Sequence, residues 1–283
     1  MIEKQEEVEV KMVKEEEIKA EKKVESEEKK KMMIIEKKRK RRYGLLLACK
    51  DSEYVKKVHG GYYNVFVKAF GEEGEEWDLF RIVDGEFPQI EDINNFDGFV
   101  VSGSPYDAYA NDPWILTLCF FIQTLYTMNK TLLGVCFGHQ AICRALGGKV
   151  GKACHGWDIG VTKLIMVENS FWCKYLPSDE ELIPLFPSIL ECHQDEVWEV
   201  PVGGEVIAFS EKTRVEMVTI GDHILGIQGH PEYTKDIISE LIQRLLANHS
   251  IQWDYAEDLK SKLETLEPHW KFWQKICKSF LKG

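Results

Sequence analysis

Short apolar runs alternate with helical patterns through the first half of the chain. The apolar runs cover residues 44–49, 77–83, 97–101 and 132–136, and the helical patterns cover residues 62–70, 113–128 and 140–146. An apolar run of about four to eight residues that leads into a helix is typical of a buried strand in a parallel sheet. Repeated units of this kind indicate a parallel sheet that helices cover on both faces.

Beyond residue 148 the apolar runs become shorter and are separated by Gly, Asp and His. They cover residues 159–167, 205–210, 215–220 and 224–228. This pattern predicts an antiparallel extension, or strands that return to the sheet. Helical patterns follow at 236–246 and 270–281, and we interpret the aromatic residues of the second as core. The predicted fold class is α/β, with a single doubly wound, mostly parallel sheet flanked by helices and an antiparallel extension.

Residues 1–42 are almost all charged or aliphatic and contain no aromatic residue, glycine or proline. Such a segment cannot bury enough apolar surface to offset its ordering entropy, so we predict a charged low-complexity tail, disordered or a fraying single helix. Its basic run at 37–42 fits a nuclear-localisation or anion-binding patch, although a solvated tail is the commoner use of such runs. The predicted domain is residues 43–283.

Composition and charge narrow the class of protein. Hydrophobic residues make up 44% of the 283 residues, and no apolar run approaches the ~18 residues that span a membrane. The first residues contain no apolar stretch of the kind found in secretory signals, so we predict no such signal. The eight cysteines include no C-x-x-C pair, so we expect reduced thiols in the cytosol and neither disulfides nor a metal site. No phosphate-binding glycine motif occurs, so no nucleotide cofactor is predicted.

The charge is divided unevenly along the chain. Residues 1–42 hold 15 Lys and Arg against 12 Asp and Glu. Residues 43–283 hold the other 21 Lys and Arg and 35 Asp and Glu, which gives them a net charge of −14. An acidic body argues against nucleic acid as a partner of the domain. Five basic residues are candidate contacts for an anionic substrate, although each is also an ordinary surface residue: Lys50, Lys56, Lys57, Arg81 and Arg144.

Cys136 ends the fourth predicted strand and is followed at once by a helical pattern. Gly134 and Gly138 flank it, and glycines at those positions relieve the crowding of a sharp strand-to-helix turn. A helix N-terminus favours the thiolate, which is the nucleophilic form of cysteine. The alternative is a buried cysteine at a strand end, because cysteine is among the most buried residue types.

A cysteine nucleophile needs a base and a group that orients that base. His230 and Glu232 follow a short predicted strand and precede a helix, so in a parallel sheet they lie at the same edge as Cys136. Glu232 can fix the tautomer of the imidazole and stabilise its cation. A second polar cluster at 192–196 contains His193, Gln194 and Asp195, which either line a polar substrate or form a surface turn.

An acyl-transfer site also needs donors for the developing oxyanion. The backbone N–H of Phe137, directly after the nucleophile, is one candidate. The turn at Gly103, after the third predicted strand, is a second candidate. The alternative is an ordinary turn that only ends the strand.

These residues together resemble the class I glutamine amidotransferase family, on the motifs Gly134-Val135-Cys136-Phe137-Gly138-His139-Gln140 and Gly229-His230-Pro231-Glu232. The resemblance implies a flavodoxin-like domain in which cysteine attacks a γ-carbonyl, histidine is the base and glutamate orients it. It also implies that Gly103 and Phe137 form the oxyanion hole and that Gln140 lies against the substrate.

A closer resemblance, covering almost all of residues 43–283, is to the plant γ-glutamyl peptidases. It is carried by Cys49-Lys50-Asp51-Ser52-Glu53, Gly60-Gly61-Tyr62, Phe70-Gly71-Glu72-Glu73-Gly74, Cys192-His193-Gln194-Asp195-Glu196-Val197 and Trp273-Gln274-Lys275-Ile276-Cys277-Lys278. The resemblance implies stand-alone hydrolysis of the γ-glutamyl bond of glutathione conjugates. Residues 1–42 match nothing in that family, and the turn at 103–104 reads Gly-Ser where many amidotransferases have Gly-Gly.

Three hypotheses follow for the function. The first is a cysteine hydrolase that forms a γ-glutamyl thioester on Cys136, without a cofactor, and acts on a small-molecule substrate. The second is a glutaminase subunit that supplies ammonia to a partner synthetase, which is less expected because the chain has no second domain and no nucleotide motif. The third is a binding module without turnover, against which the complete set of Cys136, His230 and Glu232 argues.

Overall fold

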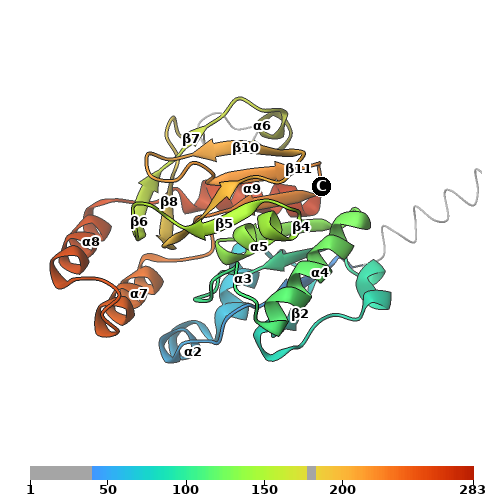
Figure 1. The fold of residues 1–283 in the computed structure, drawn as a ribbon, viewed down its shortest axis with the longest axis horizontal. Coiled ribbons are helices and arrows are strands. Elements are labelled where there is room, and N and C mark those ends of the chain that lie inside the picture. Colours follow the sequence, from blue (N-terminus) through green and yellow to red (C-terminus); the bar gives the residue numbers. More distant parts are fainter. Residues whose placement is uncertain (1–39, 177–182) are drawn as a thin grey trace, which may run out of the picture. The chain divides into compact units, whose positions relative to one another are not determined.

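The computed structural model describes residues 40–176 and 183–283. The chain divides into two units, residues 1–41 and residues 42–283. Most of the predicted tail, residues 1–39, lies outside the described residues, and the first strand begins at Arg42. The second unit forms one α/β domain, and the description below concerns that unit (Figure 1).

An eight-stranded sheet forms the centre of the domain, in the order β2-β1-β3-β4-β12-β11-β10-β7. Its strands are β1 (Arg42–Leu46), β2 (Glu76–Phe80), β3 (Gly98–Val101), β4 (Thr131–Val135), β7 (Ile165–Met166), β10 (Gly204–Phe209), β11 (Met217–Ile220) and β12 (Ile224–Ile227). The first five in the spatial order pair in parallel, and β11, β10 and β7 pair antiparallel. The predicted fold class is confirmed, and each of the first four strands lies within a few residues of its predicted place.

Helices cover both faces of the sheet, and side chains alternate between two cores. Leu45 and Val100 face the core that contains Phe66 of α3 and Trp273 of α9. Their chain neighbours Leu46 and Val101 face the opposite core, beside α4 and α5. This alternation follows from the two-residue period of a strand. The helices are α2 (Glu53–His59), α3 (Tyr62–Phe70), α4 (Pro113–Thr127), α5 (Phe137–Ala145), α6 (Ser170–Tyr175), α7 (Lys235–Ala247), α8 (Trp253–Thr265) and α9 (Trp270–Lys282), with short 3-10 turns at Ile82–Asp84 and Ile90–Asn95.

Two small antiparallel ribbons pack beside the main sheet, and of their strands the hydrophobic pattern predicted only the one that begins at Asp158. They pair β5 (Lys149–Lys152) with β9 (Asp195–Glu199), and β6 (Asp158–Lys163) with β8 (Ser188–His193). The surface-turn interpretation of the cluster at 192–196 was wrong, because His193 and Asp195 are buried on adjoining strands. The prediction of strand 159–167 was correct in place, but that segment is divided between β6 and β7.

The aromatic residues of the last helix lie in the core, as predicted. Phe272, Trp273 and Phe280 are all nearly inaccessible to solvent. The indole of Trp273 also donates a hydrogen bond of 3.0 Å to the carbonyl of Ser188, which ties α9 to β8. No helix in the described part of the chain has the length and apolar character needed to cross a bilayer.

The five parallel strands place their carboxyl ends along one edge of the sheet. In spatial order, β2 is followed by Arg81, β1 by Cys49 and Lys50, β3 by Gly103, β4 by Cys136, and β12 by His230. The direction of chain winding reverses between β1 and β3, and open α/β sheets bind ligands at such a switch point. The topology therefore brings together residues as far apart along the chain as Cys49 and His230, which are 181 residues apart.

Candidate active site

Cys136 occupies a sharp turn between β4 and α5. Its backbone has φ 52° and ψ −105°, a left-handed conformation that is rare for a residue with a side chain. The flanking glycines allow this turn, because a Cβ atom on Gly134 would lie 2.5 Å from the carbonyl carbon of Gly138. Such strain at a buried cysteine supports a functional role for the turn.

His230 lies beside the thiol and is held by a carboxylate. Its Nδ1 is 2.8 Å from Oε1 of Glu232, and both side chains are almost fully buried. The ring of Tyr233 stacks on the imidazole with centroids 4.0 Å apart and planes 2° from parallel. The backbone N–H of His230 donates to the carbonyl of Leu190 at 2.8 Å. These contacts fix the position and the orientation of the ring.

The charges of the three side chains reinforce one another. Burial by itself would lower the pKa of His230, but the negative charges of Glu232 and Cys136 outweigh it and raise that pKa to about 10. Burial raises the pKa of the Cys136 thiol, and the neighbouring His230 acts in the opposite direction. His230 therefore keeps its proton near neutral pH, and its positive charge counteracts the burial that raises the pKa of the Cys136 thiol.

The turn after β3 closes the site from the side of β1. A Cβ atom on Gly103 would lie 2.9 Å from Cε1 of His230 and 3.6 Å from Cβ of Cys136, so only glycine fits against the unshifted pair. Two serine side chains hold this turn against Ala48. The hydroxyl of Ser102 accepts a hydrogen bond of 2.9 Å from the N–H of Ala48, and the hydroxyl of Ser104 donates one of 2.7 Å to the carbonyl of Ala48. The predicted donor role of Gly103 is compatible with this placement and stays a prediction.

Phe137, the other predicted oxyanion donor, opens helix α5. Backbone N–H groups in the first turn of a helix have no acceptor within the helix, so they are available to a ligand. The Phe137 side chain is buried and stacks on Trp114 with centroids 5.6 Å apart. This packing fixes the start of α5.

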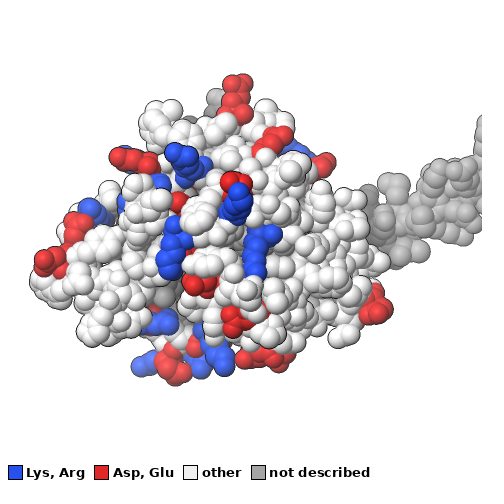
Figure 2. Space-filling view, in the orientation of Figure 1, with Lys and Arg blue, Asp and Glu red and all other residues white. Residues whose placement is uncertain are grey.

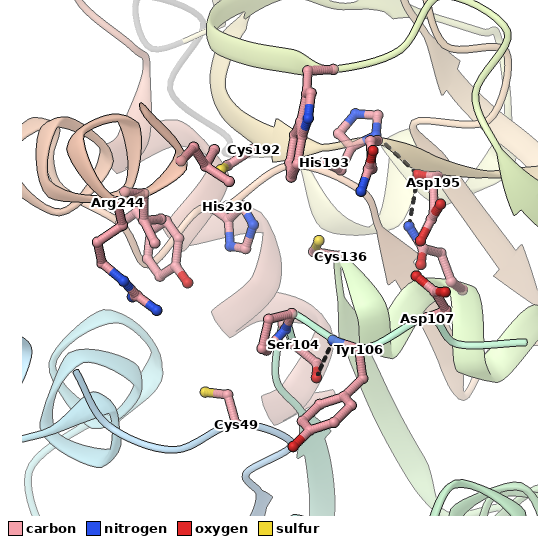
Figure 3. A pocket seen from close by; sticks show the side chains of 18 of the residues that line it. Cys49, Ser104, Tyr106, Asp107, Cys136, Cys192, His193, Asp195, His230 and Arg244 are labelled. Atoms are coloured by element: carbon pink, nitrogen blue, oxygen red, sulfur yellow. Dashed lines mark hydrogen bonds between the residues drawn. The ribbon is translucent and has the colours of Figure 1, made fainter. Parts of the chain in front are cut away.

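A cavity of about 490 Å³ opens over the thiol (Figure 3). Of the residues predicted for the site, those that line the cavity are Gly103, Cys136, Gln140, His193, Gln194, Asp195 and His230. Glu232 and Phe137 lie outside its lining. Figure 3 shows Asp107 and Asp195 on one side of Cys136 and His230, and Arg244 on the other.

The acidic end of the cavity is formed by Asp195, which the sequence analysis named, and Asp107, which it did not; Lys152 and Tyr109 support Asp195 from outside the cavity lining. Lys152 Nζ lies 3.2 Å from Asp195 and 3.7 Å from Asp107. The hydroxyl of Tyr109 is 3.4 Å from the same Asp195 oxygen. Burial raises the pKa of Asp195, while Lys152 acts to lower it. The two carboxylates offer partners for a positively charged group of a ligand.

Gln140 has a positioning contact in addition to its predicted place beside the substrate. Its amide nitrogen donates to the carbonyl of Asp195 at 2.8 Å and to the side chain of Gln228 at 3.0 Å. It therefore links α5 to β9 and to the end of β12. Arg144, a candidate anion contact, instead donates to the carbonyls of Ala108 and Ala110 at 2.7 and 2.5 Å.

Behind the cavity lies a buried acidic pair, Glu191 and Glu216, both inaccessible to solvent. Burial raises the pKa of Glu216 to about 8, and burial together with Glu216 raises that of Glu191 well above its ordinary value. His193 Nε2 is 3.5 Å from Glu191, and burial lowers the pKa of His193 to about 4, so it is neutral. Across residues 40–176 and 183–283, no three His, Cys, Asp or Glu side chains are arranged to hold a metal ion.

Comparison with known proteins assigns the family. Residues 55–249 match the family described as glutamine amidotransferase class-I. The chain belongs to the class-I glutamine amidotransferase family. It is also 48% identical to γ-glutamyl peptidase 3 of Arabidopsis thaliana over 86% of this chain and 98% of that one, and 49% identical to γ-glutamyl peptidase 5 of the same plant over 86% and 96%.

Solved structures agree with the fold of this family member. A glutamine amidotransferase from Methylobacillus flagellatus superposes with a TM-score of 0.63 over 86% of this chain and 94% of that one, at 17% identity. Identity this low supports the fold alone. The resemblance read from the motifs around Cys136 and His230 is therefore confirmed at the level of family and close relatives, whereas the roles of individual residues remain predictions.

Proposed function

We propose that this protein is a γ-glutamyl hydrolase that cleaves the γ-glutamyl bond of glutathione conjugates in the cytosol. The observation that carries the proposal is that Cys136 and His230 line a cavity whose two ends differ in charge, with Glu232 holding His230 from behind at 2.8 Å. Similarity to the two Arabidopsis γ-glutamyl peptidases supports the same reaction class.

In the first half of the reaction, the thiolate of Cys136 attacks the γ-carbonyl carbon of the substrate. The N–H groups of Phe137 and Gly103 stabilise the developing oxyanion. Protonated His230 then gives its proton to the leaving α-amine, the carbon–nitrogen bond breaks, and the γ-glutamyl group remains as a thioester. Glu232 stabilises the imidazolium until that transfer.

In the second half, water enters the position that the amine has left. Neutral His230 takes a proton from the water as it attacks the thioester carbon. The carbon–sulfur bond breaks, glutamate leaves, and the thiolate–imidazolium pair is restored. The high pKa of His230, about 10, suits its acid role in the first half, and Glu232 helps it recover a proton in the second.

The charged ends of the cavity suit the two ends of such a substrate. Asp107 and Asp195 line the cavity and would bind the α-ammonium of the γ-glutamyl group. Arg244 lies at the opposite end, and among the described residues its one ion pair is with Glu240 at 3.7 Å, so it is available for the terminal carboxylate of the peptide.

Product analysis tests the proposal. Purified protein is offered glutathione, S-benzylglutathione and free glutamine side by side, and glutamate and ammonia are quantified. Glutamate released from the conjugate, without ammonia, is the expected result. Ammonia from glutamine alone would replace the proposal with a glutaminase subunit that serves a synthetase. Cys143→Ala is a matched control for Cys136→Ala, because Cys143 is buried on the same helix outside the cavity.

A further inference from the structure

A second cavity of about 290 Å³ lies at the carboxyl ends of β1 and β2. Its lining consists of Leu47, Cys49, Lys50, Asp51, Lys56, Arg81 and Asp84. Cys49 and Lys50 also line the catalytic cavity, so the two cavities share a wall. A substrate branch that passes Cys49 would reach the second cavity from the first.

The two carboxylates of this cavity already have partners within the protein. Asp51 accepts a hydrogen bond of 2.6 Å from the N–H of Tyr62, at the beginning of α3, where the helix dipole also favours negative charge. Asp84 lies 3.5 Å from Lys50. These contacts offset part of the negative charge that faces the cavity.

The basic side chains of this cavity are less completely paired with carboxylates than the acidic ones are with cations or N–H groups. Lys56 pairs at 3.0 Å with Glu53, which is exposed on the same helix and outside the lining. In the part of the chain that the structure describes, the guanidinium of Arg81 has no ion pair and no hydrogen bond. Arg81 is therefore the uncompensated charge of this cavity. Figure 2 shows basic side chains gathered with acidic ones over the α2 end of this face.

The position of this cavity relative to the thiol suggests what it binds. In Figure 3, Cys49 lies across Cys136 from Asp195, on the side of the catalytic cavity where Arg244 also lies. If the glutamyl end occupies the acidic side and the peptide carboxylate reaches Arg244, the remaining branch of the substrate is the group on the cysteine sulfur. That branch is the part of a conjugate that would extend past Cys49.

We infer that the second cavity is a subsite for a carboxylate, or a similar anion, carried on the sulfur substituent of the conjugate, with Arg81 and Lys50 as its partners. The inference rests on the proposed function and adds to it a substrate preference. Arginine suits this role because its planar fork binds carboxylates through two hydrogen bonds.

The test uses two conjugates that differ in charge and hardly in shape, S-(para-carboxybenzyl)glutathione and S-(para-carbamoylbenzyl)glutathione. The wild-type protein is expected to show a kcat/KM for the carboxylate about twofold to fivefold above that for the amide, the range that exposed ion pairs supply. This preference is expected to shrink as salt is added, because the cations are exposed. In Arg81→Gln, kcat/KM for the carboxylate is expected to fall several-fold more than for the amide.

Lys57→Gln is the matched control, since Lys57 is exposed on α2 beside Lys56 but does not line the cavity. It is expected to keep the wild-type ratio. Equal kcat/KM for both conjugates in the wild type, or an unchanged ratio in Arg81→Gln, would overturn the subsite while the proposed function stands. Absence of hydrolysis of both conjugates and of S-benzylglutathione would overturn the proposed function and the subsite together.

Discussion

Replacing Glu216 with glutamine is expected to make the protein more stable at alkaline pH. Glu216 is fully buried, and burial raises its pKa from the ordinary value of 4.5 to about 8. Because the folded state binds this proton more tightly than the unfolded state, the group favours folding below pH 4.5. That contribution is lost as the pH rises towards 8.

The magnitude follows from the two pKa values. Each pH unit between them costs about 1.4 kcal/mol of unfolding free energy. Between pH 5 and pH 8 the wild type is therefore expected to lose about 3 kcal/mol through Glu216, a large share of the roughly 5–15 kcal/mol that holds a domain folded. Glutamine keeps the shape of the side chain and removes its titration.

Urea unfolding at pH 5 and pH 8 measures this difference. The gain of Glu216→Gln over wild type is expected to be about 3 kcal/mol larger at pH 8 than at pH 5. The buried His139 is present in both proteins and cancels, and Glu191 stays strongly shifted in both because burial is the largest cause of its raised pKa. Glu211→Gln, on the exposed loop beyond β10, serves as the control. An equal gain at both pH values would refute the reasoning.

Three further changes test the catalytic arrangement. Glu232→Gln removes a charge that raises the pKa of His230, so kcat/KM is expected to fall at least about tenfold and its alkaline limb to move to lower pH; an unmoved limb would contradict the role of Glu232. Gly103→Ala brings a methyl group within 2.9 Å of His230 and is expected to lower kcat about 100-fold without changing the thermal midpoint, whereas full kcat would show that the turn yields freely. Arg244→Met is expected to raise KM about twofold to fivefold for a conjugate with a free terminal carboxylate but not for its carboxamide, and an equal rise for both would remove Arg244 from substrate recognition.

The sequence was sufficient to predict the parallel half of the sheet and the group around Cys136. Parallel strands buried on both faces appear as continuous apolar runs, which are easy to recognise. The glycines beside Cys136 are required by the turn itself, as the contact between Gly134 and Gly138 shows. His230 and Glu232 could be placed with Cys136 because the carboxyl ends of parallel strands share one edge.

Asp195 was among the candidate residues, but its neighbours Asp107 and Lys152 could not be predicted in the same way. Lys152 reaches Asp195 because β5 pairs with β9, two short strands more than 40 residues apart with many polar residues. Their burial comes from tertiary packing, which overrides the weak local preference of polar residues for strands. Arg244 lies at the cavity only because α7 packs beside it, and nothing in its neighbours along the chain distinguishes it from a surface arginine.

The most direct test of the account is to look for the covalent intermediate on Cys136. Wild-type protein, Cys136→Ala and Cys143→Ala are mixed with S-benzylglutathione, quenched in acid within one turnover and weighed intact by mass spectrometry. The account predicts a mass increase of one glutamyl group on the wild type and on Cys143→Ala, and none on Cys136→Ala. Turnover without any adduct on the wild type, or an adduct that persists in Cys136→Ala, would contradict it.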